Sequence, residues 1–474
     1  MISKFIYLIL GLLVLQLYPT GIGPVENYNA FNAAVQTAIL LAAYTAAGFG
    51  LFFYLKNRVT AYEFLRPAQR YLIMSYNFAL LLVYAYILFY LNWPLIWKVD
   101  YPVDFPGADI FLDYAPYLAG IILSYLPSYM IERRLRKNPA SLGAYLNFNL
   151  RSIILTALLP VFFLNFVLEY AAQFRVMSFA FQLYPYMEWL LLISLFLLVF
   201  YLSPFFMRFI WGAVAMPKSP LRARLEGLCA KAGIKCSNFY VWNTRCGILN
   251  AAIAGLSGFT RHIFITDALL EKFSDDQICA VIAHEIGHAK KLHIAKYILL
   301  FFSSFFAVMA LTYSQPDSSL VLINITLFMA FFWIVIFTAM SRRFEAEADM
   351  YAVELTGNAE TFASALDSLA ELSGGIRNMP SITHSSIAER VHFLWLTVLF
   401  PEYAAKFRSH MKRLLTIVFV FFFAGLAGTG FIISKEMKNR DKQLVQLYYR
   451  DLDYYGIDLL QQERYSEGIP VMQE

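Results

Sequence analysis

Residues 274–314 read SDDQICAVIAHEIGHAKKLHIAKYILLFFSSFFAVMALTYS, a polar segment with two central histidines that runs directly into a long apolar one. Ser274 and Gln277 have the spacing of a capping box, which predicts that a helix begins there. His284 and His288 are four positions apart and therefore share one face of that helix. The apolar segment is long enough to cross a bilayer. The sequence thus predicts a metal-binding helix at the boundary of a membrane domain.

The composition also indicates a membrane protein. The chain has 474 residues, of which 59% are hydrophobic and 15% are charged. A soluble domain has about 25% charged residues and about 45–50% apolar ones. The formal net charge of +5 is small for this length and gives no case for a nucleic-acid partner.

Nine apolar stretches each approach the roughly 20 residues that a membrane-spanning helix needs. They cover residues 4–20, 32–55, 71–93, 109–131, 152–172, 186–211, 295–314, 318–340 and 412–434. We interpret the first as an uncleaved helix, because its basic region is Lys4 alone and no small-x-small cleavage site follows. We therefore expect a mainly α, polytopic membrane protein with about nine transmembrane helices.

Basic residues occur in alternate loops and predict an orientation. The loops after the second and fourth spans contain Lys56, Arg58, Arg66, Arg70, Arg133, Arg134, Arg136 and Lys137. The other loops carry Asp100 and Asp104 or almost no charge. The positive-inside rule places the basic loops in the cytosol, and the count of spans then places residues 212–294 and 341–411 there too.

The motif His284-Glu285-Ile-Gly-His288 is HExxH, the helical arrangement that brings two imidazoles to one metal ion. Glu285 projects to the side, close enough to hold a water bound to the metal. Zinc lowers the pKa of such a water towards neutrality, and a carboxylate can then take its proton. The site needs a third protein ligand and one open position. The alternative, a helix with two surface histidines in salt bridges, does not account for the acidic residues downstream.

Those acids are Glu345-Ala-Glu-Ala-Asp349, which two apolar spans return to the same membrane face. Glu345 and Asp349 share a helix face, so one can bind the metal while the other orients a histidine. Glu347 lies about 200° from Glu345 around the axis. Arg343, four positions before Glu347, is a pairing that fits a solvated face. We therefore predict Glu345 as the third ligand; for the acidic segment taken alone, a solvated acidic helix start would be the commoner explanation.

His293 is a weaker candidate ligand. It lies nine positions beyond His284, about 180° around a continuous helix, and should point away from the metal. The glycine turn that precedes the third histidine of metzincins is also missing. We expect His293 to be a membrane-interface histidine.

Residues 220–395 resemble the membrane gluzincins, the family that contains the CAAX prenyl proteases and the HtpX-like proteases. The motifs occur in the family's order: Asn250-Ala251 with Gly255, Ile265-Thr266 with Leu269-Leu270, Ser274-Asp-Asp before HEIGH, EAEAD, and His384-Ser-Ser-Ile-Ala-Glu-Arg390. HtpX-like proteins have fewer helices, so the predicted topology is closer to that of the prenyl proteases.

The resemblance implies a gluzincin metal site. His284, His288 and Glu345 would bind one zinc ion per chain. Glu285 would activate water, and Asp349 would orient a ligand histidine without binding the metal itself.

The resemblance also implies a set of substrate contacts. Asn250 and Ala251 would open the edge strand that pairs with the substrate backbone. His384 and Arg390 would contact the substrate or the oxyanion. Ser385-Ser386 stand where the family often has prolines, which leaves the geometry of His384 open.

The predicted organisation has six parts. Membrane helices over 1–211 are followed by a cytosolic protease segment with the HExxH helix over 212–294 and a transmembrane hairpin over 295–340. A second cytosolic segment with the third ligand covers 341–411, a transmembrane helix covers 412–434 and a tail covers 435–474. In the first cytosolic segment, the sequence pattern over residues 221–233 predicts an amphipathic helix. Short strands are predicted over 239–242, 248–253 and 262–266. The two cytosolic segments would form a small α+β domain on the membrane body.

The function we expect is peptide-bond hydrolysis in a membrane protein or membrane-associated peptide, because the site lies at the bilayer boundary. We expect a bacterial inner membrane with the site on the cytosolic side, or the endoplasmic reticulum membrane in a eukaryote. An HtpX-like quality-control protease is the alternative within the family. A multi-span transporter and an inactive scaffold with a residual metal site are alternatives of another class. Few charges in the spans disfavour the first, and the intact Glu285 disfavours the second. The sequence leaves the oligomeric state open.

Overall fold

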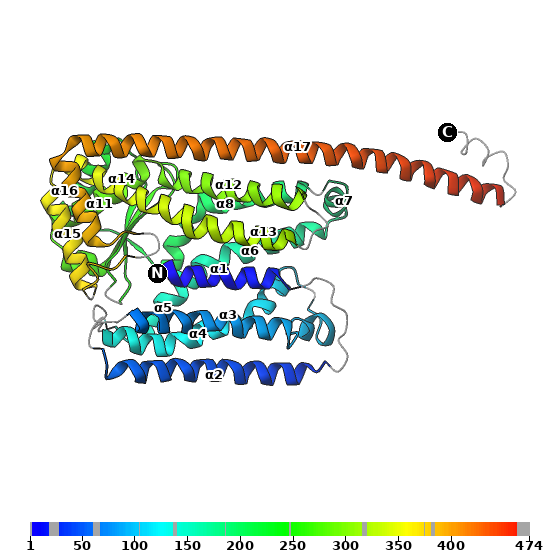
Figure 1. The fold of residues 1–474 in the computed structure, drawn as a ribbon, viewed down its shortest axis with the longest axis horizontal. Coiled ribbons are helices and arrows are strands. Elements are labelled where there is room, and N and C mark those ends of the chain that lie inside the picture. The colour runs from blue at the N-terminus through cyan, green and yellow to red at the C-terminus, as the bar shows by residue number, and fades with distance from the viewer. Residues whose placement is uncertain are drawn as a thin grey trace. The chain divides into compact units, whose positions relative to one another are not determined.

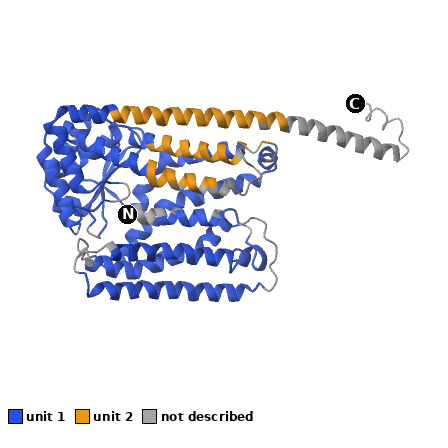
Figure 2. Ribbon diagram, in the orientation of Figure 1, with its two compact units in different colours: residues 1–182, 187–296, 337–409 blue, residues 183–186, 297–336, 410–474 orange. Residues whose placement is uncertain are grey.

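The structure is a computed structural model that describes residues 2–18, 28–59, 67–103, 105–135, 140–184, 186–245, 248–314, 320–373, 375–380 and 384–461. Helices dominate the described chain, as predicted (Figure 1). The chain divides into two compact units (Figure 2). The first contains residues 1–182, 187–296 and 337–409, and the second contains residues 183–186, 297–336 and 410–474.

The N-terminal part of the chain is helical. Its helices are α1 (Ile2–Gln16), α2 (Ala30–Lys56), α3 (Pro67–Phe89), α4 (Ala108–Leu135), α5 (Leu142–Asn149), α6 (Thr156–Ala172), α7 (Arg175–Leu183) and α8 (Tyr186–Trp211). In the first unit, α2, α3 and α4 run side by side (Figure 1). Short π-helical turns cover Ile96–Asp100 and Leu150–Leu155.

Eight helices of the described chain are long and apolar enough to cross a membrane. They cover Ala30–Lys56, Ala68–Phe89, Ala108–Arg134, Leu142–Ala172, Tyr186–Trp211, His293–Thr312, Leu327–Thr356 and Pro401–Asn439. The remaining predicted span, residues 4–20, corresponds to α1, which has 15 residues. A helix of that length covers about 22 Å, less than the roughly 30 Å of a hydrocarbon core.

The predicted membrane orientation rests on charged loop residues, some of which the structure describes. Arg66, Asp104, Arg136 and Lys137 lie outside the described residues. The argument does not depend on α1, because it compares the loops between the second and fifth predicted spans.

A four-stranded sheet follows the N-terminal helices in sequence. Its strands are β1 (Val214–Ala215), β2 (Asn238–Trp242), β3 (Ala251–Ala254) and β4 (His262–Thr266), in the order β1-β2-β4-β3. β2 and β4 are parallel, whereas β1 pairs with β2 and β3 with β4 in antiparallel register. The three predicted strands are confirmed. β1 was not predicted, because two residues are too few to show alternation.

The sheet is packed against helices of the same unit. Trp242 of β2 stacks on Trp211 of α8, with ring centroids 4.0 Å apart. It also stacks on Phe148 of α5 at 5.5 Å. These aromatic contacts fix the sheet at one end of α5 and α8.

The remaining helices are α9 (Pro220–Ala232), α10 (Asp267–Lys272), α11 (Asp275–Lys290), α12 (His293–Ser314), α13 (Leu320–Phe331), α14 (Thr338–Thr356), α15 (Ala359–Leu372), α16 (Ile387–Leu399) and α17 (Pro401–Gln461). α9 confirms the helix predicted over 221–233, and the capping box of Ser274 and Gln277 begins α11 as expected. α11 packs closely on α14 because both present a small residue. A Cβ atom on Gly287 would lie 3.1 Å from the Cα atom of Ala348.

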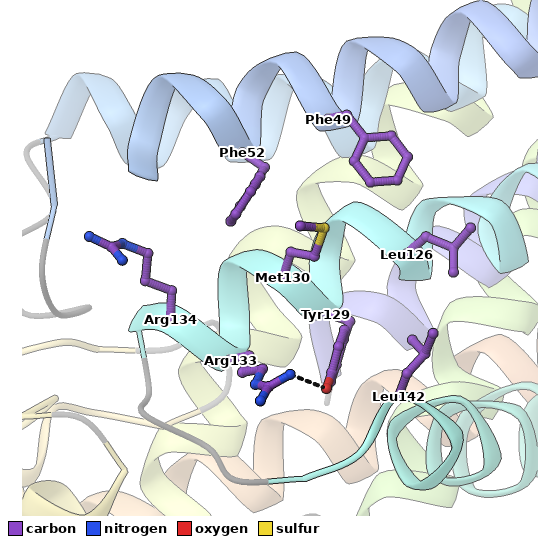
Figure 3. Close-up of a pocket in the computed structure, with 8 residues that line it drawn as sticks. All are labelled: Phe49, Phe52, Leu126, Tyr129, Met130, Arg133, Arg134 and Leu142. Atoms are coloured by element: carbon purple, nitrogen blue, oxygen red, sulfur yellow. Dashed lines mark hydrogen bonds between the residues drawn. The ribbon is translucent and has the colours of Figure 1, made fainter. Parts of the chain in front are cut away.

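A recess of about 720 Å³ lies between α2, α4 and α5 of the first unit (Figure 3). Its lining is apolar apart from two arginines and consists of Phe49, Phe52, Leu126, Tyr129, Met130, Arg133, Arg134 and Leu142. The Arg133 guanidinium donates to the Tyr129 hydroxyl at 3.2 Å. None of these residues belongs to the helices that carry the predicted metal ligands.

Candidate metal centre

The three predicted ligands lie together in the first unit. α11 supplies His284 and His288, α14 supplies Glu345, and their ligand atoms all lie within 4.8 Å of one another. The two Nε2 atoms are 3.1 Å apart. Glu345 Oε2 lies 3.5 Å from His284 Nε2, and Glu345 Oε1 lies 3.5 Å from His288 Nε2.

This spacing can be compared with that of a zinc site. Two ligand atoms that each lie about 2.0–2.1 Å from one tetrahedral zinc ion are about 3.3 Å apart. The separations of 3.1 and 3.5 Å bracket that value. The donor set of two imidazoles and one carboxylate is also one that zinc binds in catalytic sites. These residues therefore fit a single metal ion.

The electrostatics of the cluster favour a positive charge between the ligands. His284 Nδ1 lies 2.8 Å from Oδ1 of Asp349, which is fully buried. Burial by itself lowers the pKa of His284, but Asp349 and Glu345 outweigh it and raise that pKa to about 10. Burial and the neighbouring His284 lower the pKa of His288 to about 3. The carboxylates thus stabilise one positive charge here, which a bound cation would supply.

Glu285 lies between the cluster and the edge of the sheet. Its Oε2 accepts a hydrogen bond from the Ile253 backbone N–H at 3.3 Å. Burial raises the pKa of Glu285 to about 7, and a cation held nearby would lower it again. A carboxylate with a pKa in this range can both take and return a proton.

The segment next to Glu285 is the predicted edge strand. β3 pairs only with β4 in the described sheet, so the edge position is confirmed. The Thr266 N–H donates to the Asn250 carbonyl at 3.1 Å. Since N–H groups alternate in direction along an antiparallel strand, those of Ala251 and Ile253 face away from β4. The bond from Ile253 to Glu285 agrees with this direction.

His384 and Arg390 contact the two carboxylates of α14, Glu345 and Asp349. His384 Nδ1 lies 3.0 Å from Glu345 Oε2, and its side chain is 41% exposed. Arg390 of α16 donates to both carboxylate oxygens of Asp349, at 2.9 and 2.6 Å. Contact of either side chain with a substrate stays a prediction, and Arg390 also holds the carboxylate that faces His284.

The departure at Ser385-Ser386 has a structural explanation. Ser386 is the N-cap of α16 and forms a capping box with Glu389. A hydroxyl at this position accepts the Glu389 N–H at 3.2 Å, which a proline could not do. The serine therefore fixes the start of the helix that carries Arg390.

Comparison with known proteins agrees with this geometry. Residues 216–398 match the model of peptidase family M48. The chain carries a family M48 peptidase region. The CAAX prenyl protease 1 homolog of Dictyostelium discoideum is 25% identical over 347 residues, which cover 64% of this chain and 78% of that protein. CAAX prenyl protease 1 of Saccharomyces cerevisiae is 23% identical over 184 residues, covering 38% and 40%.

An HtpX relative and a solved structure extend the comparison. The Protease HtpX homolog of Bacteroides fragilis is 30% identical over 161 residues, which cover 30% of this chain and 49% of that protein. The crystal structure of S. mikatae Ste24p superposes with a TM-score of 0.54 at 20% identity, covering 76% of this chain and 98% of the other. The resemblance to the membrane gluzincins is confirmed, and the fold is shared with Ste24p. Together with the eight described helices that are long and apolar enough to cross a membrane, the M48 region makes this chain a membrane metalloprotease.

Two residues of the M48 region lie where they were not expected. α11 ends before Leu292, whose φ of 55° breaks the helix, so His293 turns back towards the site. His293 Nδ1 lies 2.8 Å from His288 Nδ1, so His293 contacts a candidate ligand and the expected opposite-face position is wrong, although His293 is not among the three residues of the metal cluster. Glu347 was expected on a solvated face, but it pairs with His293 and Lys296 and is 16% exposed. The first error came from assuming that the HExxH helix continues past residue 290, and the second from interpreting Arg343, four positions before Glu347, as the mark of a solvated face.

Proposed function

We propose that this chain is a zinc-dependent endopeptidase that hydrolyses peptide bonds in membrane proteins or membrane-associated peptides. The spacing of His284, His288 and Glu345 carries the proposal, because three donors at tetrahedral separations lie beside the half-buried carboxylate of Glu285. These residues would hold one zinc ion per chain. When bound, zinc supplies a Lewis acid that makes water acidic near neutral pH.

The side chains around the ligands have distinct proposed roles. Glu285 takes the proton from the attacking water and returns it to the leaving amine. Asp349 holds the Nδ1 side of His284, and Arg390 holds Asp349 in turn. His384, half exposed beside Glu345, would contact the substrate carbonyl or the oxyanion.

The substrate would bind as an extra strand. Asn250 begins the segment, and the outward N–H of Ala251 and the outward carbonyls of Ala251 and Ile253 offer hydrogen bonds to an extended peptide, while the Ile253 N–H donates to Glu285. Such pairing places the scissile bond next to Glu285 without recognising particular side chains. Specificity must then come from elsewhere in the membrane body.

We place the substrate at the membrane. The match to the Dictyostelium protein named CAAX prenyl protease 1 homolog extends over 347 residues, whereas the HtpX match extends over 161. The longer match reaches beyond the M48 region and therefore favours the prenyl-protease type over the HtpX-like alternative.

We propose that the site faces the cytosol, at a bacterial inner membrane or at the endoplasmic reticulum in a eukaryote. The basic residues Arg133 and Arg134 end α4, and the following helix α5 packs Phe148 on Trp242 of the sheet. The basic residues and the sheet contact at Phe148 therefore both lie near the N-terminal end of the longer helical span Leu142–Ala172. Single cysteines at positions 134 and 98, labelled with an impermeant reagent in sealed vesicles, should react from opposite sides.

The direct test of the proposal uses the purified full-length chain in detergent or nanodiscs. Metal analysis should find one zinc ion per chain, and cleavage of a quenched-fluorescence peptide library should stop with a chelator and return with added zinc. A chain that binds no zinc, or that binds it without cleaving any peptide, would support the inactive scaffold instead.

A further inference from the structure

A second row of polar groups, with the buried His293 at its centre, lies behind His288, outside the residues to which the proposed function gives a role. His293 Nδ1 lies 2.8 Å from His288 Nδ1, and His293 Nε2 lies 3.0 Å from Glu347 Oε2. The Lys296 ammonium donates to the same Glu347 oxygen at 3.2 Å. The row therefore runs from a candidate ligand through one imidazole to a carboxylate.

The protons of this row can be assigned from what each group can donate. His288 can bind a metal through Nε2 only if that atom has a free lone pair, so its proton must sit on Nδ1. It then donates to His293 Nδ1, which must be the acceptor. The proton of His293 is consequently on Nε2 and is donated to Glu347, which accepts only. Lys296 balances the charge at the end of the row.

The surroundings hold His293 in this orientation. Its side chain is 1% exposed. The ring stacks on Phe344 of α14, with centroids 4.6 Å apart and planes inclined by 17°. Leu292 breaks the helix immediately before it and places His293 at the start of α12. A ring confined in this way offers its two nitrogens to two fixed partners.

We propose that His293 and Glu347 are positioning residues that set the tautomer and ring orientation of His288, so that its Nε2 is presented to the metal. A ligand histidine usually donates its other N–H to a fixed acceptor, and losing that acceptor typically costs about 10–100-fold in metal affinity. The inference rests on the proposed function, because it requires that His288 binds the metal. Asp349 contacts His284 directly, whereas Glu347 would orient His288 through His293.

The test uses two substitutions of His293 that differ in hydrogen bonding. His293→Phe keeps a planar ring against Phe344 but removes the acceptor. His293→Asn is smaller, yet its Oδ1 lies close to the position of the lost Nδ1 and can still accept. Glu347→Gln weakens the far end of the row, and Glu354→Gln is the matched control, because Glu354 lies on the same helix in an exposed pair with Arg408.

Two measurements on the full-length chain decide the outcome: the zinc Kd by competition with a chromophoric chelator, and the visible absorption spectrum of the cobalt-substituted protein. We expect His293→Phe to weaken zinc binding by about 10–100-fold and to change the cobalt spectrum. His293→Asn should recover most of that affinity, Glu347→Gln should lose less than His293→Phe, and Glu354→Gln should match the native chain.

The inference is overturned if His293→Phe and Glu347→Gln both bind zinc like the native chain with unchanged cobalt spectra. It is also overturned if His293→Asn is as weak as His293→Phe, because packing rather than an acceptor would then matter. If His293→Phe does not fold, Glu347→Gln against Glu354→Gln gives the decision. Failure of the native chain to bind zinc would refute the proposed function itself, a result that these comparisons between variants cannot produce.

Discussion

The two imidazoles of the HExxH helix are supported in different ways. His284 faces the carboxylate of Asp349 directly, at 2.8 Å, and Arg390 fixes that carboxylate with two hydrogen bonds. On its Nδ1 side, His288 contacts His293, which stands between it and the Glu347 carboxylate. A carboxylate in direct contact increases the basicity of a ligand more than one that acts through a neutral ring.

The difference extends to the elements that carry the support. Asp349 lies on α14 and is fully buried, and Arg390 lies on α16 and is 12% exposed. His293 and Lys296 lie on α12, beyond the break at Leu292. Metal affinity should therefore depend more strongly on the His284 side than on the His288 side, and substitutions can be ranked accordingly.

The largest effect is expected for Glu345→Ala. Glu345 lies 3.5 Å from both Nε2 atoms, so its loss removes a ligand shared by the two sides. Zinc content should fall to background and hydrolysis should disappear, as measured by metal analysis and peptide cleavage. A Glu345→Ala chain that retains one zinc ion would show that the third ligand has been misassigned.

Asp349→Asn should have the next largest effect, because it breaks the His284 side alone. The amide cannot carry the charge that balances Arg390, and it holds His284 less firmly. Zinc affinity should fall by about 100-fold, at the upper end of the range for such partners. Competition with a chelator measures the change. A loss smaller than that of Glu347→Gln would reverse the proposed ranking of the two sides.

Arg390→Lys tests the support of His284 with a smaller chemical change than Asp349→Asn. The ammonium keeps the charge but cannot bridge both oxygens of Asp349. Zinc affinity should fall by about 10-fold, less than in Asp349→Asn. Arg408→Lys is the control, since Arg408 pairs with Glu354 at the surface. Equal effects of the two substitutions would mean that the bidentate contact does not support the site.

Ser386→Ala should produce the smallest effect on the metal. It removes the N-cap of α16 and should lower stability by about 1 kcal/mol. Zinc affinity should stay within about twofold, because Arg390 is held by Asp349 as well as by its helix. The thermal unfolding midpoint and the zinc Kd, measured on the same sample, separate the two effects. A large loss of zinc affinity would instead make the cap part of the metal site.

The spacing of residues within one helix was readable from the sequence. HExxH and EAEAD each place their members on one face by helical periodicity, and the structure brings His284, His288, Glu345 and Asp349 together. The capping box at Ser274 and the edge position of β3 followed from equally local patterns. Their roles in binding and catalysis remain proposals.

The sequence did not predict the features that lie beyond the end of the HExxH helix. Ala289-Lys-Lys-Leu292 contains no glycine or proline, so nothing in it predicts a break, yet Leu292 adopts a left-handed conformation. That single turn decides where His293 points, and with it whether Glu347 faces water or the site. The pairing of Arg390 with Asp349 was missed because the two residues are far apart in the chain, and helical spacing does not extend across such a distance.

The most direct test of the central claim is the zinc-loaded Glu285→Gln chain. The three proposed ligands are unchanged, so zinc content should equal that of the native chain. The amide cannot accept a proton, so peptide hydrolysis should fall by about 10²–10⁴-fold or more. Native turnover in a zinc-loaded Glu285→Gln chain would contradict the mechanism, and loss of zinc from it would show that Glu285 belongs to the metal site instead.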